Sequence, residues 1–102
     1  MKLLIVEDDL ALARELALLC GKWNFTAVYT EDFHNIAEEY QRKQPDLILM
    51  DSNLPCYDGF YWSGKIREIS MVPIIFLSSR DQNADKIMAM AAGGDDYVEK
   101  PL

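Results

Sequence analysis

The sequence contains little cysteine, histidine or basic charge. Two cysteines among 102 residues, Cys20 and Cys56, are too few for a disulfide framework and favour a reducing, cytoplasmic compartment. The single histidine, His34, makes no metal site by itself. Ten basic residues stand against 17 acidic ones, and the net charge of −7 argues against direct binding of nucleic acid or an anionic membrane.

The sequence also lacks a long apolar run. None approaches the ~20 residues of a membrane span, so we expect no membrane contact. A chain of 102 residues is too short to hold a second, substrate-binding or lid domain. Half of the residues are hydrophobic and 26% are charged, which is typical of a globular protein. We therefore expect one domain over residues 1–102.

Three short apolar runs, at residues 3–6, 47–50 and 74–77, do not alternate with polar residues. Runs of this kind are typical of parallel strands that are covered on both faces. Two more polar segments, residues 25–29 and 96–98, are weaker strand candidates. The sequence therefore predicts five strands.

Helical patterns separate the predicted strands. Apolar residues at positions 12, 16 and 19 recur at helical spacing, and Gly21 is placed to follow that helix. A second stripe runs through residues 33–40, with Thr30 as its expected N-cap. Residues 60–69 and 81–92 are predicted to form two further helices.

Strict alternation of strands and helices predicts an α/β fold, with a parallel sheet between two helical layers. The three most apolar strands should be central and the two polar ones should be edges. The strand order 2-1-3-4-5 satisfies this, and it is the flavodoxin-like, doubly wound arrangement. Ligands of such folds bind outside the carboxyl ends of the strands, at the switch point between strands one and three.

Chemically active side chains follow several of these strand ends. Glu7 and Asp8 follow the first strand, Asp51 ends the third, Ser78 ends the fourth and Lys100 follows the fifth. Clustered carboxylates repel one another unless a cation neutralises them, and Mg²⁺ prefers such oxygen ligands. A carboxylate can also attack phosphorus to form an aspartyl phosphate. The next acid, Asp9, has the simpler role of a helix N-cap.

In these features the sequence resembles the receiver domains of bacterial two-component response regulators. The resemblance covers residues 2–102. The C-terminal segment of the sequence is most similar to that of regulators that carry a winged-helix DNA-binding domain. The matching motifs are Ile5-Val6-Glu7-Asp8, the strand 46–51 ending in Asp51, Leu54-Pro55, Asp58-Gly59, Ser78 and the segment 95–101 with Tyr97 and Lys100-Pro101.

The resemblance implies a role for each residue. Asp51 would accept a phosphoryl group from a sensor histidine kinase, and Lys100 would pair with that group. Mg²⁺ would be held by Glu7, Asp8, Asp51 and the backbone carbonyl of Asn53. Ser78 and Tyr97 would be the switch residues that change the surface around the fourth helix and fifth strand. The domain would catalyse only its own phosphorylation and dephosphorylation, and is not an enzyme in the usual sense.

Receivers continue past the Lys-Pro pair into a fifth helix, which this sequence lacks after Leu102. We therefore expect a receiver that is C-terminally truncated, with DNA bound only through an output domain absent from the chain. An uncovered apolar face would follow, and a second copy of the chain could cover it in a homodimer.

Two other functions fit parts of the pattern. The first is a receiver-like dimerisation module that never takes phosphate, but such a module should have lost some of the five residues at the strand ends. The second is a small Mg²⁺-dependent phosphohydrolase that uses Asp51. Those of the haloacid dehalogenase type carry a second aspartate where this sequence has Asn53, and also a cap domain.

Two residues outside this site have plain interpretations. Cys56 lies near Asp51 in sequence, but we interpret it as an ordinary core or loop cysteine. His34 stands among polar residues and is expected on the surface of the second helix.

Overall fold

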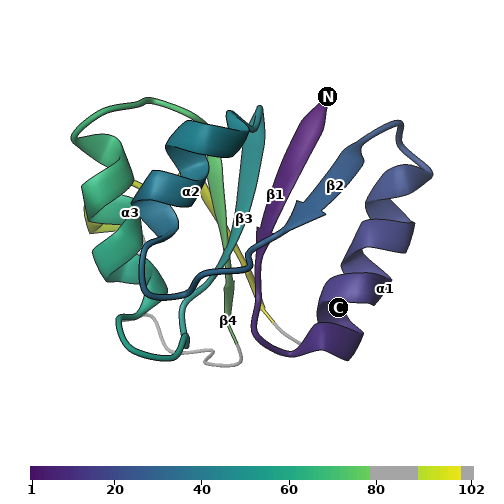
Figure 1. The fold of residues 1–102 in the computed structure, drawn as a ribbon, viewed down its shortest axis with the longest axis horizontal. Helices are drawn as coiled ribbons and strands as arrows, with labels where there is room; N and C mark the ends of the chain where they lie inside the picture. Colours follow the sequence, from purple (N-terminus) through teal and green to yellow (C-terminus); the bar gives the residue numbers. More distant parts are fainter. Residues whose placement is uncertain (79–89, 100–102) are drawn as a thin grey trace.

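The structure is a computed structural model, and it describes residues 1–78 and 90–99. Strands and helices alternate along the described chain up to the fourth strand (Figure 1). The strands are β1 (Lys2–Val6), β2 (Thr26–Tyr29), β3 (Leu47–Asp51), β4 (Ile74–Ser78) and β5 (Asp96–Glu99). The helices with both ends in the described residues are α1 (Leu10–Gly21), α2 (Ile36–Lys43) and α3 (Gly59–Arg67).

The five strands form one parallel sheet in the order β2-β1-β3-β4-β5. The predicted fold class and strand order are therefore confirmed. The strand β2 lies at an edge of the sheet and is less buried than its neighbour. Thr26 and Tyr29 are exposed, whereas β1 is buried from Leu3 to Val6.

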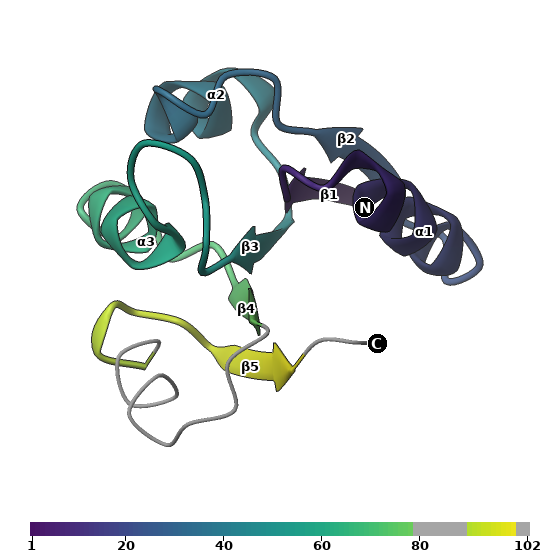
Figure 2. The same cartoon turned by 90° about the horizontal axis from the view of Figure 1, so that it is seen from below.

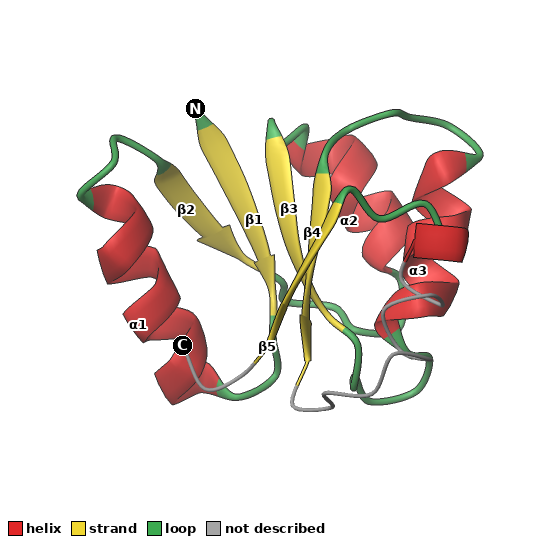
Figure 3. Cartoon of the chain, turned by 180° about the vertical axis from the view of Figure 1, so that it is seen from behind, coloured by secondary structure: helices red, strands yellow, loops and turns green. Residues whose placement is uncertain are grey.

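Helices cover both faces of the sheet, with α1 on one side and α2 and α3 on the other (Figures 2 and 3). Side chains of a strand point to alternate faces, so neighbouring residues belong to different cores. Leu4 and Val6 pack in the core beneath α2 and α3, whereas Leu3 and Ile5 pack beneath α1. This double burial explains why residues 3–6, 47–50 and 74–77 of the central strands are all apolar.

Each described helix begins at a side chain that accepts a hydrogen bond from the third residue after it. Asp9 accepts from the Leu12 N–H over 3.3 Å, as the sequence predicts, and Asp58 accepts from the Tyr61 N–H over 2.9 Å. These carboxylates satisfy backbone donors that the first helical turn leaves free. Because both helices follow strand ends, their N-termini lie at the edge of the sheet where the acidic residues cluster.

The prediction for the second helix was wrong at its start. Asn35 is the N-cap of α2, and its side chain accepts from the Glu38 N–H over 3.2 Å. Thr30 instead extends the β2 pairing, because its N–H donates to the Ile5 carbonyl over 3.0 Å. His34 consequently lies in the loop before α2, although it is exposed as expected.

The remaining helices differ from prediction in smaller ways. Gly21 is the last residue of α1 and Lys22 is its C-cap, and the third helix spans Gly59–Arg67 in place of 60–69. The predicted helix 81–92 lies mostly outside the described residues. Within the described parts of the chain, no helix is long and apolar enough to cross a membrane.

Candidate functional site

Strand register places the predicted residues at one edge of the sheet. Val6 of β1 pairs with Met50 of β3, so Glu7 and Asp51 follow at the same level. Asp51 in turn pairs with Leu77 of β4, which brings Ser78 one position beyond it. The parallel arrangement is the reason that residues far apart in the sequence meet here.

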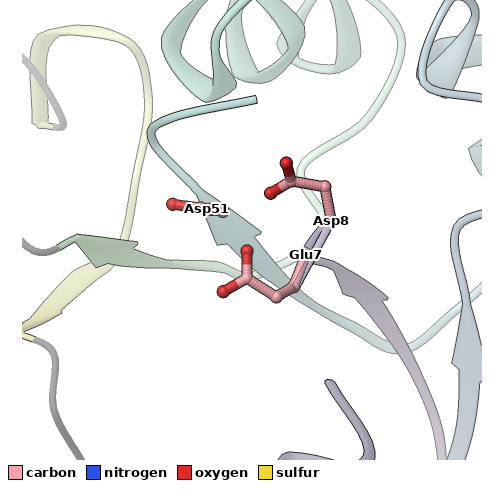
Figure 4. A group of neighbouring side chains, drawn as sticks. All are labelled: Glu7, Asp8 and Asp51. Carbon is pink, nitrogen blue, oxygen red and sulfur yellow. The ribbon is translucent and has the colours of Figure 1, made fainter. Parts of the chain in front are cut away.

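The side chains of Glu7, Asp8 and Asp51 form a tight acidic group (Figure 4). One carboxylate oxygen from each residue lies within 4.8 Å of the others. Glu7 and Asp51 are buried, with exposed fractions of 5% and 3%, whereas Asp8 is exposed. The group therefore opens to solvent on the side of Asp8.

The acidic group fits a hard divalent cation. Three carboxylates so close together repel by a few kcal/mol per pair at an effective dielectric constant of about 20. Oxygen ligands of this type suit Mg²⁺, which commonly uses one or two carboxylates and keeps several waters. The donor set contains no sulfur or imidazole, so it does not resemble a zinc site.

The loop after β3 holds the Asp51 carboxylate in place. Its Oδ1 atom accepts a hydrogen bond from the Asn53 N–H over 3.1 Å. Ser52 lies between these two residues, and its N–H donates to the Leu77 carbonyl over 2.9 Å. The Ser52 carbonyl accepts from the Gly59 N–H over 3.2 Å. The loop is thus tied to both β4 and α3.

The other predicted residues fall in different positions. Ser78 is the last residue of β4 and its side chain is fully buried. Tyr97 lies in β5, half-buried against the core beneath α2 and α3. Asn53 is exposed beside Asp51. Lys100 lies outside the described residues.

Cys56 is an exposed loop cysteine, consistent with its prediction. Its Sγ atom lies 3.3 Å from Nδ1 of His34, a contact that the sequence analysis did not foresee. The backbone of Cys56 has a φ of 71°, in the left-handed region. This contact joins the loop before α2 to the loop before α3.

Two charged residues have structural roles that sequence reasoning missed. The Arg67 guanidinium lies 2.8 Å from the Asp95 carboxylate, and the same carboxylate oxygen accepts from the Ile74 N–H. The buried carboxylate of Glu39 accepts from the Glu31 N–H over 2.8 Å. Glu39 could have been noticed in the sequence, because it follows Ile36 by three residues and so lies near the buried face of its helix.

Comparison with known proteins agrees with this architecture. Residues 3–102 match the family described as Response regulator receiver domain. The chain belongs to the response regulator receiver domain family. The predicted resemblance is therefore confirmed, and the family is one of signalling domains.

The chain is 46% identical over 102 residues to the response regulator protein GraR of Staphylococcus saprophyticus subsp. saprophyticus. That match covers the whole chain and 46% of the relative, so the receiver spans about half the length of the curated relatives that it matches.

Solved structures of response regulators are similar as well. The N-terminal domain of the nisin resistance regulator NsrR has a TM-score of 0.87 at 39% identity, covering 99% of this chain and 86% of that one. The BeF3-activated N-terminal receiver domain of Klebsiella pneumoniae RstA has a TM-score of 0.93 at 30% identity, covering 100% of this chain and 87% of that one.

Proposed function

We propose that this receiver is a phosphorylation-controlled switch whose phosphoacceptor is Asp51. The observation that carries the proposal is the position of Asp51 at the end of β3, buried and within 4.8 Å of the Glu7 and Asp8 carboxylates. A structural carboxylate would not gain from two acidic neighbours, because like charges destabilise one another. Binding of a cation and acceptance of a phosphoryl group would explain why these three carboxylates lie together.

The proposed reaction is phosphoryl transfer from a phosphohistidine of a sensor kinase. A carboxylate oxygen of Asp51 attacks phosphorus, an O–P bond forms, and the N–P bond to the imidazole breaks. The imidazole nitrogen leaves with the bonding electron pair. The result is an aspartyl phosphate on this chain and an unmodified histidine on the kinase.

Glu7, Asp8, Asp51 and the Asn53 carbonyl are the residues that would hold Mg²⁺. When bound, that ion supplies positive charge against the phosphoryl oxygens. The Asn53 N–H orients Asp51 through its 3.1 Å hydrogen bond to Oδ1. The other carboxylate oxygen of Asp51 is the one we assign to the attack.

The switch follows from the charge that the transfer adds. A phosphoryl group carries about −1.5 to −2 charges and three strong acceptor oxygens. We assign the Ser78 hydroxyl and the Lys100 ammonium to those oxygens. Movement of Ser78 would let Tyr97 shift its packing, which is a change of population between two states of one fold.

The signalling context is part of the same proposal. The partners are a sensor histidine kinase in the cytoplasm and a second copy of the chain. Relatives are about twice as long as the match, which leaves room for an output domain. We assign DNA binding to such a winged-helix domain, because the receiver itself carries a net charge of −7.

Intact-mass measurement tests the proposal. The protein is incubated with Mg²⁺ and acetyl phosphate, alongside the Asp51→Asn variant. We expect a labile adduct of one phosphoryl group on the wild type and none on the variant. Wild-type protein without any adduct would support the phosphate-independent dimerisation module, and release of phosphate without an adduct would support the hydrolase.

A further inference from the structure

Three residues of α3 lie on one stripe of the helix and face two different parts of the molecule. Gly59, Ser63 and Arg67 are spaced four residues apart, which places them along one face. We call them the α3 stripe. Its first residue meets the end of β3, and its other two meet the segment that leads into β5.

At the first end, Gly59 lies against the phosphoacceptor strand. A Cβ atom on Gly59 would collide with the carbonyl oxygen of Asp51 and come within 2.9 Å of the Met50 side chain. The Gly59 N–H also donates to the Ser52 carbonyl over 3.2 Å. The helix therefore begins in direct backbone contact with Asp51 and its neighbour.

At the other end, the stripe holds residues 92–95. The fully buried Ser63 hydroxyl donates to the Ala92 carbonyl over 2.8 Å. Nε of Arg67 donates to the Gly93 carbonyl over 2.8 Å, and its Nη2 atom donates to the Asp95 carboxylate over 2.8 Å. Nη1 of Arg67 donates to the Val72 carbonyl over 2.6 Å, so the same guanidinium also binds the chain before β4.

The backbone at Gly93 is shaped around this contact. Its φ is +93°, a conformation that other residues rarely adopt, and a Cβ atom there would lie 2.5 Å from Cγ of Arg67. Asp95 is fixed further by β4, because its N–H donates to the Ile74 carbonyl over 2.8 Å. β5 begins at the next residue, and Tyr97 is its second residue.

We propose that the α3 stripe couples Asp51 to the start of β5 through the body of the helix, with Arg67 as its positioning residue. A small displacement of the β3 end passes to Gly59, because the contact leaves no space to absorb it. A short helix moves as a rigid unit, so Ser63 and Arg67 carry the displacement to residues 92–95. The inference rests on the proposed phosphorylation of Asp51, and adds a route to Tyr97 that does not pass through Ser78.

The test compares wild type with Arg67→Ala, the milder Ser63→Ala, Arg67→Lys and the control Lys65→Ala. Lys65 is exposed on the same helix and lies outside the α3 stripe. Each protein is studied with and without Mg²⁺ and beryllium fluoride, a stable mimic of the aspartyl phosphate. Two readouts are taken, namely the extent of mimic binding and the amide NMR signals and exchange rates of residues 93–97.

Without the mimic, we expect Arg67→Ala to raise amide exchange at residues 93–97 at least ten-fold, with β1 amides unchanged. In the wild type, the mimic should change the chemical shifts of these amides. That change should be at least two-fold smaller in Arg67→Ala, and it should be reduced by less in Ser63→Ala. Arg67→Lys should recover part of the response, and Lys65→Ala should match wild type. Mimic binding should stay within two-fold throughout.

Three results would overturn the coupling. The first is a mimic-induced chemical-shift change in both Arg67→Ala and Ser63→Ala that is as large as in the wild type. The second is a wild type that binds the mimic without any chemical-shift change at residues 93–97. The third is a rise of amide exchange in Arg67→Ala that is uniform across the sheet. A wild type that fails to bind the mimic at all would contradict the proposed function itself. The two failures are therefore distinguished by the binding readout.

Discussion

Gly59 at the start of α3 packs its backbone directly against the carbonyl oxygen of Asp51 at the end of β3. No side chain larger than hydrogen fits between the helix and the strand at this point. The position of the candidate phosphoacceptor is therefore set by helix packing as well as by the sheet.

Gly59→Ala should destabilise the fold by about 1–3 kcal/mol, because an added methyl group forces the backbone of Asp51 or of the helix to move. The free energy of unfolding can be measured by urea titration. Gly64→Ala is the matched control, since a Cβ atom there meets nothing within 4 Å. That control should gain about 0.5–1 kcal/mol from helix propensity. Equal effects of the two substitutions would contradict the packing argument.

Asp8→Asn should weaken Mg²⁺ binding at least ten-fold, because it removes one of three charges that lie within 4.8 Å of one another. Titration calorimetry with Mg²⁺ measures the affinity. Asp9→Asn is the control, since Asp9 caps α1 and asparagine caps a helix equally well. An Asp9→Asn variant that loses as much affinity as Asp8→Asn would show that the effect is one of general charge.

Glu39→Ala should destabilise the chain by about 2 kcal/mol, because it removes a buried acceptor and leaves Lys43 without this partner. The Glu39 carboxylate is 1% exposed, lies 3.3 Å from Lys43 Nζ and accepts from the Glu31 N–H. Gln41→Ala, at an exposed position of the same helix, should change stability by less than about 0.5 kcal/mol. Chemical denaturation compares the two, and indistinguishable midpoints would refute the role of Glu39.

The two cysteines should react with iodoacetamide at different rates. Burial raises the pKa of the Cys20 thiol, so less of it is thiolate at pH 8 and its alkylation is slow. Cys56 is exposed and should be modified at least ten times faster. Peptide mass mapping after a short reaction gives both rates. In urea the rates should converge, and a persistent difference there would point to a local sequence effect unrelated to burial.

Much of the fold could be predicted from the sequence, because strands that are buried on both faces of the sheet have continuous apolar runs. Residues 3–6, 47–50 and 74–77 are apolar throughout, and all three lie in the centre of the sheet. The acidic group was predictable for a topological reason, since parallel strands bring Glu7, Asp8 and Asp51 to one edge.

Local competition between capping residues was harder to predict. Thr30 and Asn35 can both cap a helix, and only tertiary pairing of Thr30 with Ile5 decides between them. The bonds of Arg67 to residues 93 and 95 span more than 25 positions, and no local pattern encodes them. The functional roles of all the site residues stay predictions, namely those of Glu7, Asp8, Asp51, Asn53, Ser78, Tyr97 and Lys100.

The most direct test of the account is the location of the phosphoryl group after reaction with acetyl phosphate and Mg²⁺. Reduction of the acyl phosphate with borohydride marks the modified residue, and fragmentation of the tryptic peptide 44–65 distinguishes Asp46, Asp51 and Asp58. We expect a single mark on Asp51 that disappears when Mg²⁺ is chelated. A mark on Asp46 or Asp58, or one that forms equally without Mg²⁺, would contradict it.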